Sequence, residues 1–325
     1  MEIYDDILQT LGNTPLVRLS RYSAGPAALV AKIESFNPGS SVKDRIGQAL
    51  IEAGERSGQL QPGGTIVEPT SGNTGLGLAM AANLRGYKMV CTAADKIPKE
   101  KVALLEAFGV EMILCPTNVE ADDPRSYYKQ AERIRDEKGA YLPYQYHNQA
   151  NPQAHYANTG PEIWRQTDGR ITHWVAGIGT GGTISGTAKY LKEQNPAIRV
   201  VGVDTIGSVY AYLHEHGEMP PEDQIHQYLI DGIGEDFLPG SVWMDTIDEV
   251  ITVDDKAAYQ AVLDLAQHES IFTGSSGGAA AVAARQVAER ESADALVVTL
   301  FPDSGERYLS KLNKEWMTEN GLLEE

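Results

Sequence analysis

Short apolar segments alternate with segments of helical periodicity along most of the chain. The apolar segments are rich in valine and isoleucine and bounded by turn residues, as buried strands are. They span residues 26–34, 64–70, 88–94, 111–116, 172–178, 199–204 and 295–302. The amphipathic segments mostly end at Gly or Asn-Pro, which predicts helices. They span residues 40–58, 74–86, 99–109, 126–139 and 183–196. This alternation predicts an α/β fold built on mostly parallel sheets, with ligands bound beyond the carboxyl ends of the strands.

One long stretch, residues 206–230, lacks clear periodicity and contains Pro-Pro, so we interpret it as a loop. It holds His214 and His216, a spacing that suggests metal binding. The nearby carboxylates do not stand at a recognised ligand spacing, which favours two solvated loop histidines. The sequence therefore predicts no metal site.

Composition narrows the class of protein. The 325 residues suffice for one large or two medium domains, and the net charge of −18 argues against nucleic acid or an anionic membrane as a partner. No apolar run reaches the ~18 residues needed to span a bilayer, and the acidic start is unlike a signal peptide. Cys91 and Cys115 alone suggest neither a disulfide framework nor a zinc site. These features predict a cytoplasmic protein.

A lysine stands where a helix is expected to begin. In ESFNPGSSVKDRIGQAL, residues 37–39 break the chain and Ser40 or Ser41 can cap the helix, which puts Lys43 in its first turn. The helix dipole disfavours a cation there. The amine is then easier to deprotonate, which suits a nucleophile or a Schiff base. Taken alone, Lys43 can equally be an exposed lysine that points to water.

The turn GIGTGG, residues 177–182, follows a strand and opens a helix. Its glycines let backbone amides approach an anion at the helix N-terminus, and Thr180 and Thr183 add hydroxyl donors, so the turn suits a phosphate monoester. It also matches the dinucleotide pattern G-x-G-x-x-G, with Asp204 at the end of the next strand as the ribose-binding acid. A dinucleotide-binding oxidoreductase therefore remains an alternative.

Two further polar turns open helices. TSGNTG, residues 70–75, offers hydroxyl, amide and backbone donors that suit a carboxylate, and FTGSSGGAAAV, residues 272–282, places Ser275 and Ser276 at a helix start. Each turn alone can be an ordinary helix cap. Together with the lysine and the phosphate turn, however, they supply the parts that pyridoxal phosphate needs.

These motifs resemble the fold-type II pyridoxal-phosphate enzymes, the family of cysteine synthase and cystathionine β-synthase. The resemblance runs from ILQTLGNTPLVRL to PDSGERYLSKLNKEWM and includes FNPGSSVKDRIG, EPTSGNTG and GIGTGGTISG. It implies two parallel-sheet-based α/β domains of the tryptophan synthase β-like type, with the cofactor in the cleft between them. Residues 1–45 and 150–325 would form the larger, cofactor-binding domain, and residues 46–149 a smaller, mobile, substrate-side domain.

The family pattern also implies roles for individual residues. Lys43 would be the Schiff-base lysine, Asn73 would contact the phenolic oxygen of the cofactor, and Ser275, or else Ser276, would face the pyridine nitrogen. The implied cofactor-binding residues are Lys43, Asn73, Gly179, Thr180, Gly181, Gly182, Thr183 and Ser275. The implied substrate-binding residues are Thr70, Ser71, Gly72, Thr74, Tyr146 and Glu235.

Three segments are closest to the catalytic core of the cystathionine β-synthases: PTNVEADDPRSYYKQAERI, YQYHNQANPQAHYANTGPEIW and DGIGEDFLP. The resemblance implies a homodimer that condenses L-serine with L-homocysteine through an aminoacrylate intermediate. The alternative is a cysteine synthase that uses O-acetylserine or O-phosphoserine and sulfide. Glu235 departs from the pattern, because animal relatives have tyrosine there. We also expect neither the haem segment nor the regulatory domains that some relatives carry.

Overall fold

The computed structural model describes residues 3–23 and 25–323. The chain forms two compact units: the smaller comprises Met1–Leu11 and Asn37–Asn151, and the larger comprises Gly12–Phe36 and Pro152–Glu325. The sequence analysis placed the boundaries between the two domains after residue 45 and after residue 149. The contacts within the structure instead assign residues 37–45, including Lys43, to the smaller unit. The mobility of the smaller unit stays a prediction.

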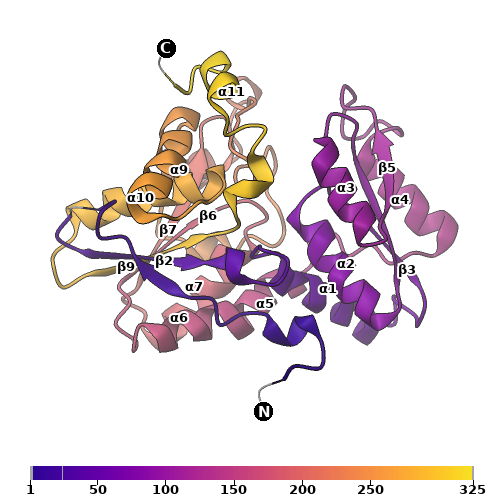
Figure 1. Cartoon of the computed structure of the whole chain (residues 1–325), viewed down its shortest axis with the longest axis horizontal. Coiled ribbons are helices and arrows are strands. Elements are labelled where there is room, and N and C mark those ends of the chain that lie inside the picture. Colours follow the sequence, from indigo (N-terminus) through magenta and orange to yellow (C-terminus); the bar gives the residue numbers. More distant parts are fainter. Residues whose placement is uncertain (1–2, 24, 324–325) are drawn as a thin grey trace. The chain divides into compact units, whose positions relative to one another are not determined.

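The larger unit contains a six-stranded sheet in the order β1-β2-β9-β6-β7-β8 (Figure 1). The strands are β1 (Leu16–Arg18), β2 (Ala28–Ile33), β6 (His173–Gly177), β7 (Arg199–Thr205), β8 (Glu249–Val253) and β9 (Leu296–Phe301). Only the pairing of β1 with β2 is antiparallel among these strands. The predicted α/β class with parallel sheets is thus confirmed.

Helices cover both faces of this sheet. The helices of this unit are α6 (Gly160–Gln166), α7 (Gly182–Gln194), α8 (Tyr210–His216), α9 (Asp255–Glu269), α10 (Ser275–Arg290) and α11 (Lys314–Glu319), and α5 (Ala150–Ala154) crosses the division at residues 151/152. Figure 1 shows α9 and α10 on one face and α6 and α7 on the other. Alanines and valines of α10 are almost fully buried against the sheet, so this helix forms the centre of the core. Its alanine-rich surface allows the close approach that such packing needs.

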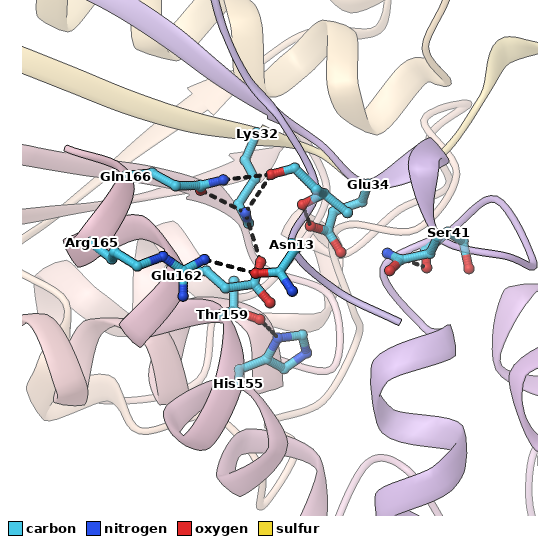
Figure 2. Close-up of polar contacts among 11 residues, drawn as sticks. Asn13, Lys32, Glu34, Ser41, His155, Thr159, Glu162, Arg165 and Gln166 are labelled. Atoms are coloured by element: carbon cyan, nitrogen blue, oxygen red, sulfur yellow. Dashed lines mark hydrogen bonds and ion pairs between the residues drawn. The ribbon is translucent and has the colours of Figure 1, made fainter. Parts of the chain in front are cut away.

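A buried ion pair connects the sheet to α6 (Figure 2). Lys32 on β2 is fully buried, and its Nζ lies 2.9 Å from a carboxylate oxygen of Glu162. The same Nζ donates to the Thr14 carbonyl and to Gln166 Oε1, at 3.0 and 2.9 Å. Three acceptors match the three protons of the ammonium, which compensates for removing this charge from water.

The smaller unit is a three-stranded parallel sheet in the order β3-β4-β5, with four helices around it. Its elements are β3 (Thr65–Pro69), β4 (Lys88–Ala94), β5 (Glu111–Cys115), α1 (Asp44–Ser57), α2 (Asn73–Arg85), α3 (Lys99–Ala107) and α4 (Tyr127–Lys138). Its core includes Val67, Val90, Ala131, Ile134 and Ala140. Gly47 of α1 lies against Gly77 of α2, which brings the two backbones together, and Arg85 of α2 forms ion pairs with Glu52 and Glu55 of α1.

The seven predicted strands and five predicted helices are present, but strands β1 and β8 and helices α5, α6, α8, α9 and α11 were not predicted. Strands β1 and β8 consist mainly of partly exposed residues, so they lack the apolar runs that mark buried strands. The prediction of a continuous loop over residues 206–230 was wrong, because Tyr210–His216 form α8. This helix is too short for periodicity to reveal it, and burial of Tyr210 anchors it instead. Within the described part of the chain, no helix is long and apolar enough to cross a membrane.

Candidate active site

Lys43 is placed by the start of α1. It is the N-cap residue, one position before the first turn in which the sequence had put it. Its backbone N–H donates to Ser41 Oγ at 3.3 Å, and its carbonyl accepts the N–H of Gly47 at 3.1 Å. Asp44 accepts the N–H of Gly39 at 2.7 Å and so holds the preceding turn. The lysine backbone is therefore fixed on both sides of the helix start.

The polar turn at residues 70–74 leads from β3 into α2. Its N-cap residue, Gly72, provides no side chain to cap the first turn. The Thr70 hydroxyl accepts the N–H of Gly72 at 3.3 Å, and Ser71 and Asn73 are partly exposed. An uncapped N-terminus of a 13-residue helix can receive a carboxylate through its backbone amides.

Thr74 differs from its neighbours in this turn. It is buried, and its hydroxyl donates to Gln145 Oε1 at 2.6 Å. Because the Thr74 hydroxyl already donates its proton to Gln145, the backbone N–H of Thr74 is the donor that remains for a substrate. Tyr146, the next residue after Gln145, is partly buried. The structure thus brings the predicted residues Thr74 and Tyr146 to neighbouring positions through Gln145, which the sequence analysis missed.

The glycine-rich turn of the larger unit, between β6 and α7, has three successive carbonyls held by hydrogen bonds. Ile178 O accepts the N–H of Gly234 at 2.8 Å, Gly179 O accepts the Tyr210 hydroxyl at 2.6 Å, and Thr180 O accepts the Ser241 hydroxyl at 2.6 Å. Because a trans peptide points its N–H away from the preceding C=O, the amides of residues 179–181 face away from these partners. The turn is thereby preorganised as an anion cup.

Gly181 completes the cup as the N-cap of α7. It has a φ of +80°, and a Cβ at this position would overlap Val242. No side chain caps the helix there, so its first amides and its dipole are available to a phosphate. Glycine is required at this position both for the left-handed backbone and for the close approach.

Thr183, in the first turn of α7, has a partner that sequence analysis missed. Its Oγ1 lies 3.2 Å from Nε2 of His155, which is fully buried. Nδ1 of the same ring lies 2.9 Å from Thr159 Oγ1 (Figure 2). His155 opens a single π-helical turn, His155–Thr159, and such turns are frequent at functional sites. The imidazole thus orients a hydroxyl of the cup, a role that no sequence spacing indicated.

The two serines at the start of α10 differ in their surroundings. The Ser275 hydroxyl accepts the N–H of Asp231 at 3.0 Å and also bonds with Tyr259. Ser276 Oγ instead lies 3.9 Å from the position of a Cβ on Gly232, and the Gly232 carbonyl in turn adjoins Gly179 of the cup. Both hydroxyls therefore lie close to residues 231–232, and the prediction of Ser275, or else Ser276, as the partner of the pyridine nitrogen stays a prediction.

Glu235 is anchored beside the start of α8. Its backbone N–H donates to Ser208 Oγ, and its carbonyl accepts the N–H of Val209, both at 3.1 Å. Burial, followed by the charge of Glu235, raises the pKa of Tyr228 well above its ordinary value. The charges of Asp204 and Asp236 act on Tyr228 in the same direction. This part of the larger unit is therefore electronegative.

Asp204 does not suit the role of a ribose-binding acid. It is fully buried at the end of β7, and its carboxylate accepts the N–H of Ala211 at 2.8 Å. Burial raises its pKa despite several hydrogen bonds. A carboxylate that holds the start of α8 inside the core is not available to a nucleotide, which removes the main support for the dinucleotide alternative.

The histidines of α8 contact backbone carbonyls. His214 Nε2 lies 3.3 Å from Ile247 O, and His216 Nδ1 lies 3.0 Å from Tyr212 O. Among the residues that the structure describes, no cluster of His, Cys, Asp or Glu could hold a metal ion.

A family model described as "Pyridoxal-phosphate dependent enzyme" matches residues 7–303. The chain belongs to this family. Its two α/β units have the architecture of the fold-type II pyridoxal-phosphate enzymes, and its cofactor is pyridoxal phosphate. The crystal structure of an O-ureido-L-serine synthase matches with a TM-score of 0.86 and 36% identity, covering 95% of this chain and 94% of that one.

Two curated pyridoxal-phosphate relatives illustrate the range of similar proteins. The chain is 42% identical over 329 residues to the cystathionine beta-synthase of Oryctolagus cuniculus; the match covers 100% of this chain but 59% of that protein. It is 39% identical over 313 residues to the O-acetylserine dependent cystathionine beta-synthase of Bacillus subtilis (strain 168), covering 96% and 98% of the two chains. The chain therefore spans about three fifths of the first relative and nearly all of the second.

The residues present fit this cofactor. A phosphate monoester requires amide donors and no competing side chain, and the cup at residues 179–183 has its carbonyls turned to other partners and glycine at its N-cap. Ser275 and Ser276 stand at the start of α10, and the hydroxyl of either would suit a neutral ring nitrogen. In the smaller unit, Lys43 is held at a helix start by fixed backbone contacts.

Proposed function

We propose that the chain condenses L-serine with L-homocysteine to form L-cystathionine and water. The observation that carries this proposal is that the mammalian and the Bacillus relatives, 42% and 39% identical, are both named for cystathionine synthesis. Only the name of the Bacillus relative states a donor, and both names state the same product. The preorganised cup and the lysine at a helix start support a pyridoxal-phosphate β-replacement reaction of this kind.

Individual residues are proposed to hold the cofactor as follows. The amides and hydroxyls of Gly179, Thr180, Gly181, Gly182 and Thr183 would bind its phosphate, and Ser275, or else Ser276, would face its ring nitrogen. Asn73 contacts its phenolic oxygen, and Lys43 forms the covalent bond to its aldehyde carbon. When bound, pyridoxal phosphate supplies a sink for the electron pair released at Cα of an amino acid.

The turn at residues 70–74 is proposed to bind the carboxylate of L-serine. The backbone amides at the start of α2 and the side chains of Thr70 and Ser71 are the donors. Glu235 is proposed to bind the ammonium of L-homocysteine, because it lies in the electronegative part of the larger unit. The opposite charge of an ammonium is favoured there, whereas sulfide would gain nothing from this field.

Lys43 is proposed to move the substrate proton. Its Nζ takes the proton from Cα of L-serine and returns it after the thiol has added. The bond from Cβ to the hydroxyl breaks, a C–S bond forms at Cβ, and the thiol proton leaves with hydroxide as water. Hydroxide is a poor leaving group, so a donor is needed at its oxygen, and Tyr146 is the proposed one.

O-acetylserine is a second candidate donor, because the Bacillus relative of nearly equal length is named as O-acetylserine dependent. Acetate leaves without protonation, so this donor would not need Tyr146. Paired with sulfide, the same chemistry would make cysteine. Lys43 and the cup serve all these reactions alike and do not discriminate between them.

The decisive experiment is kcat/KM for L-serine and O-acetylserine, each paired with L-homocysteine and with sulfide. Efficient use of L-serine with L-homocysteine supports the proposal. A preference for O-acetylserine with sulfide by orders of magnitude, with L-homocysteine inert, would make the chain a cysteine synthase. Glu235→Ala should raise the KM for L-homocysteine more than the KM for L-serine, and Glu218→Ala, an exposed acid nearby in sequence, is the control.

A further inference from the structure

Glu68 is a buried carboxylate without a cation beside it. It lies on β3 two residues before the substrate turn and is 0% exposed. Its Oε2 accepts the N–H of Tyr144 at 2.8 Å, and its Oε1 accepts the N–H of Gln145 at 3.0 Å. Within the described chain, no lysine or arginine forms an ion pair with it. A buried charge held only by backbone amides is costly, so its contacts must matter to the unit.

The backbone that Glu68 holds is strained. Tyr144 has a φ of +53°, the left-handed region, which a bulky aromatic residue rarely adopts. Its carbonyl accepts the N–H groups of His147 and Asn148, at 3.0 and 3.1 Å. The carboxylate on one side and these bonds on the other hold the turn in place. Strained residues of this kind persist only where several surrounding contacts hold their conformation, and they cluster at functional sites.

The strained turn is connected to the substrate turn by one side chain. Gln145 Oε1 accepts the Thr74 hydroxyl at 2.6 Å, and both residues are buried. The Gln145 carbonyl accepts the side-chain amide of Asn151 at 3.0 Å, which fixes the peptide from its other end. Glu68 is thus linked to Thr74 in two ways: by hydrogen bonds through Gln145, and by the chain that runs from β3 to α2.

We propose that Glu68 is a positioning residue for the substrate turn. Its carboxylate fixes the backbone at Tyr144 and Gln145, Gln145 in turn holds Thr74, and the turn at residues 70–74 is kept in the conformation that receives the carboxylate of the amino-acid donor. Glu68 itself is fully buried and does not touch the substrate. This role deepens the proposed function and rests on it, because it takes the turn to be the donor site.

The test uses the holoenzyme and three variants. Glu68→Gln keeps the size but puts an amide donor opposite one backbone N–H, so at most one of the two bonds survives. Thr74→Val removes only the bond to Gln145. Glu111→Gln, on the exposed start of β5 in the same sheet, is the matched control. Should Glu68→Gln fail to fold, Glu68→Asp shortens the carboxylate while keeping its charge.

The first readout is hydrogen exchange, which needs no substrate. In Glu68→Gln at least one of the amides of Tyr144 and Gln145 should exchange about tenfold faster, because its hydrogen bond to the side chain at position 68 is lost. Peptides covering residues 70–76 should also lose protection. In Thr74→Val the protection of residues 144–145 should stay, while residues 70–76 lose theirs. Unchanged exchange in Glu68→Gln would overturn the proposal.

The second readout is the split between kinetic constants. Glu68→Gln and Thr74→Val should each raise the KM for the amino-acid donor about tenfold, with a much smaller change in the KM for the thiol. An unchanged donor KM, or an equal rise in both KM values, would overturn the positioning role. If the wild type used neither donor, the proposed function would be wrong. The link from Glu68 to residues 70–76 would still be tested, because hydrogen exchange is measured without turnover.

Discussion

Gly47 of α1 and Gly77 of α2 lie directly against each other where the two helices cross. A Cβ on Gly47 would overlap the Gly77 carbonyl, and a Cβ on Gly77 would lie 2.7 Å from the carbonyl oxygen of Lys43. The position of the proposed cofactor lysine is thus set by a helix crossing that tolerates no side chain. Backbone atoms form both sides of this contact, so neither side can yield by changing a rotamer.

Gly77→Ala should destabilise the protein by about 1–3 kcal/mol, because the extra methyl group forces α1 and α2 apart. It should also lower kcat, since the shift moves the backbone of Lys43. Urea unfolding and steady-state kinetics measure the two effects. Leu84→Ala, on the exposed side of α2, is the control and should change stability by less than about 0.5 kcal/mol. Higher stability in Gly77→Ala, as expected for alanine in an unconstrained helix, would contradict the close crossing.

Lys43→Ala should abolish nearly all turnover while the fold survives. The lysine is at a helix start, where loss of a cation costs little and can relieve the unfavourable dipole interaction of about 0.3–1 kcal/mol. Borohydride reduction of the wild type, digestion and mass spectrometry should find the cofactor adduct on the peptide that contains Lys43. Lys99→Ala, at the exposed start of α3, should keep both adduct and activity. An adduct on another lysine would refute the assignment.

Tyr210→Phe should weaken retention of the cofactor about two- to tenfold, because one hydrogen bond that orients the phosphate cup is worth about 0.5–1.5 kcal/mol. The variant removes the hydroxyl that holds the Gly179 carbonyl. The rate at which bound cofactor is lost on dialysis, followed by absorbance, measures the effect. Tyr212→Phe on the same helix is the control, since its ring stacks on His216 and lies outside the cup. Equal loss from both variants would mean that the Gly179 contact does not shape the cup.

The pH dependence of stability should contain a contribution from Glu68. Burial raises its pKa from 4.5 to about 7, although the two backbone hydrogen bonds act in the opposite direction. The folded protein therefore keeps a proton that the unfolded chain loses above about pH 4.5, so this contribution to stability is present at low pH and disappears as the pH rises through about 7.

Between about pH 5 and 8, the unfolding free energy of the wild type should fall relative to that of Glu68→Gln, by an amount on the order of 3 kcal/mol. The other ionisable groups that Glu68 influences are Cys91, Tyr141 and Tyr144. Burial raises the pKa of each above its ordinary value, so they stay neutral in this range. Denaturant unfolding of both proteins across this range measures the difference. Parallel pH profiles for the two proteins would show that Glu68 does not titrate as expected.

Much of the larger architecture follows from local pattern. The strands β2, β3, β4, β6, β7 and β9 are mostly buried apolar runs, β5 is an apolar run that is partly exposed, and each predicted helix carries its own periodicity and stop residues. Lys43 and the glycine turn were found because their chemistry depends on short-range position relative to a helix start. Helix starts and turn residues are encoded within a few residues, so a single sequence reveals them.

The tertiary structure decided what depends on residues far apart in the chain. Glu68 contacts the backbone at residues 144–145, and His155 contacts Thr183, across separations of 76 and 28 residues. The Ser275 hydroxyl likewise accepts the N–H of Asp231, across a separation of 44 residues. Buried polar contacts of this kind follow from which segments the sheet order brings together, and no local spacing encodes that order. The sequence by itself thus determined the cofactor class and the helix starts that hold it, whereas packing alone decided which buried side chains keep those helix starts in position.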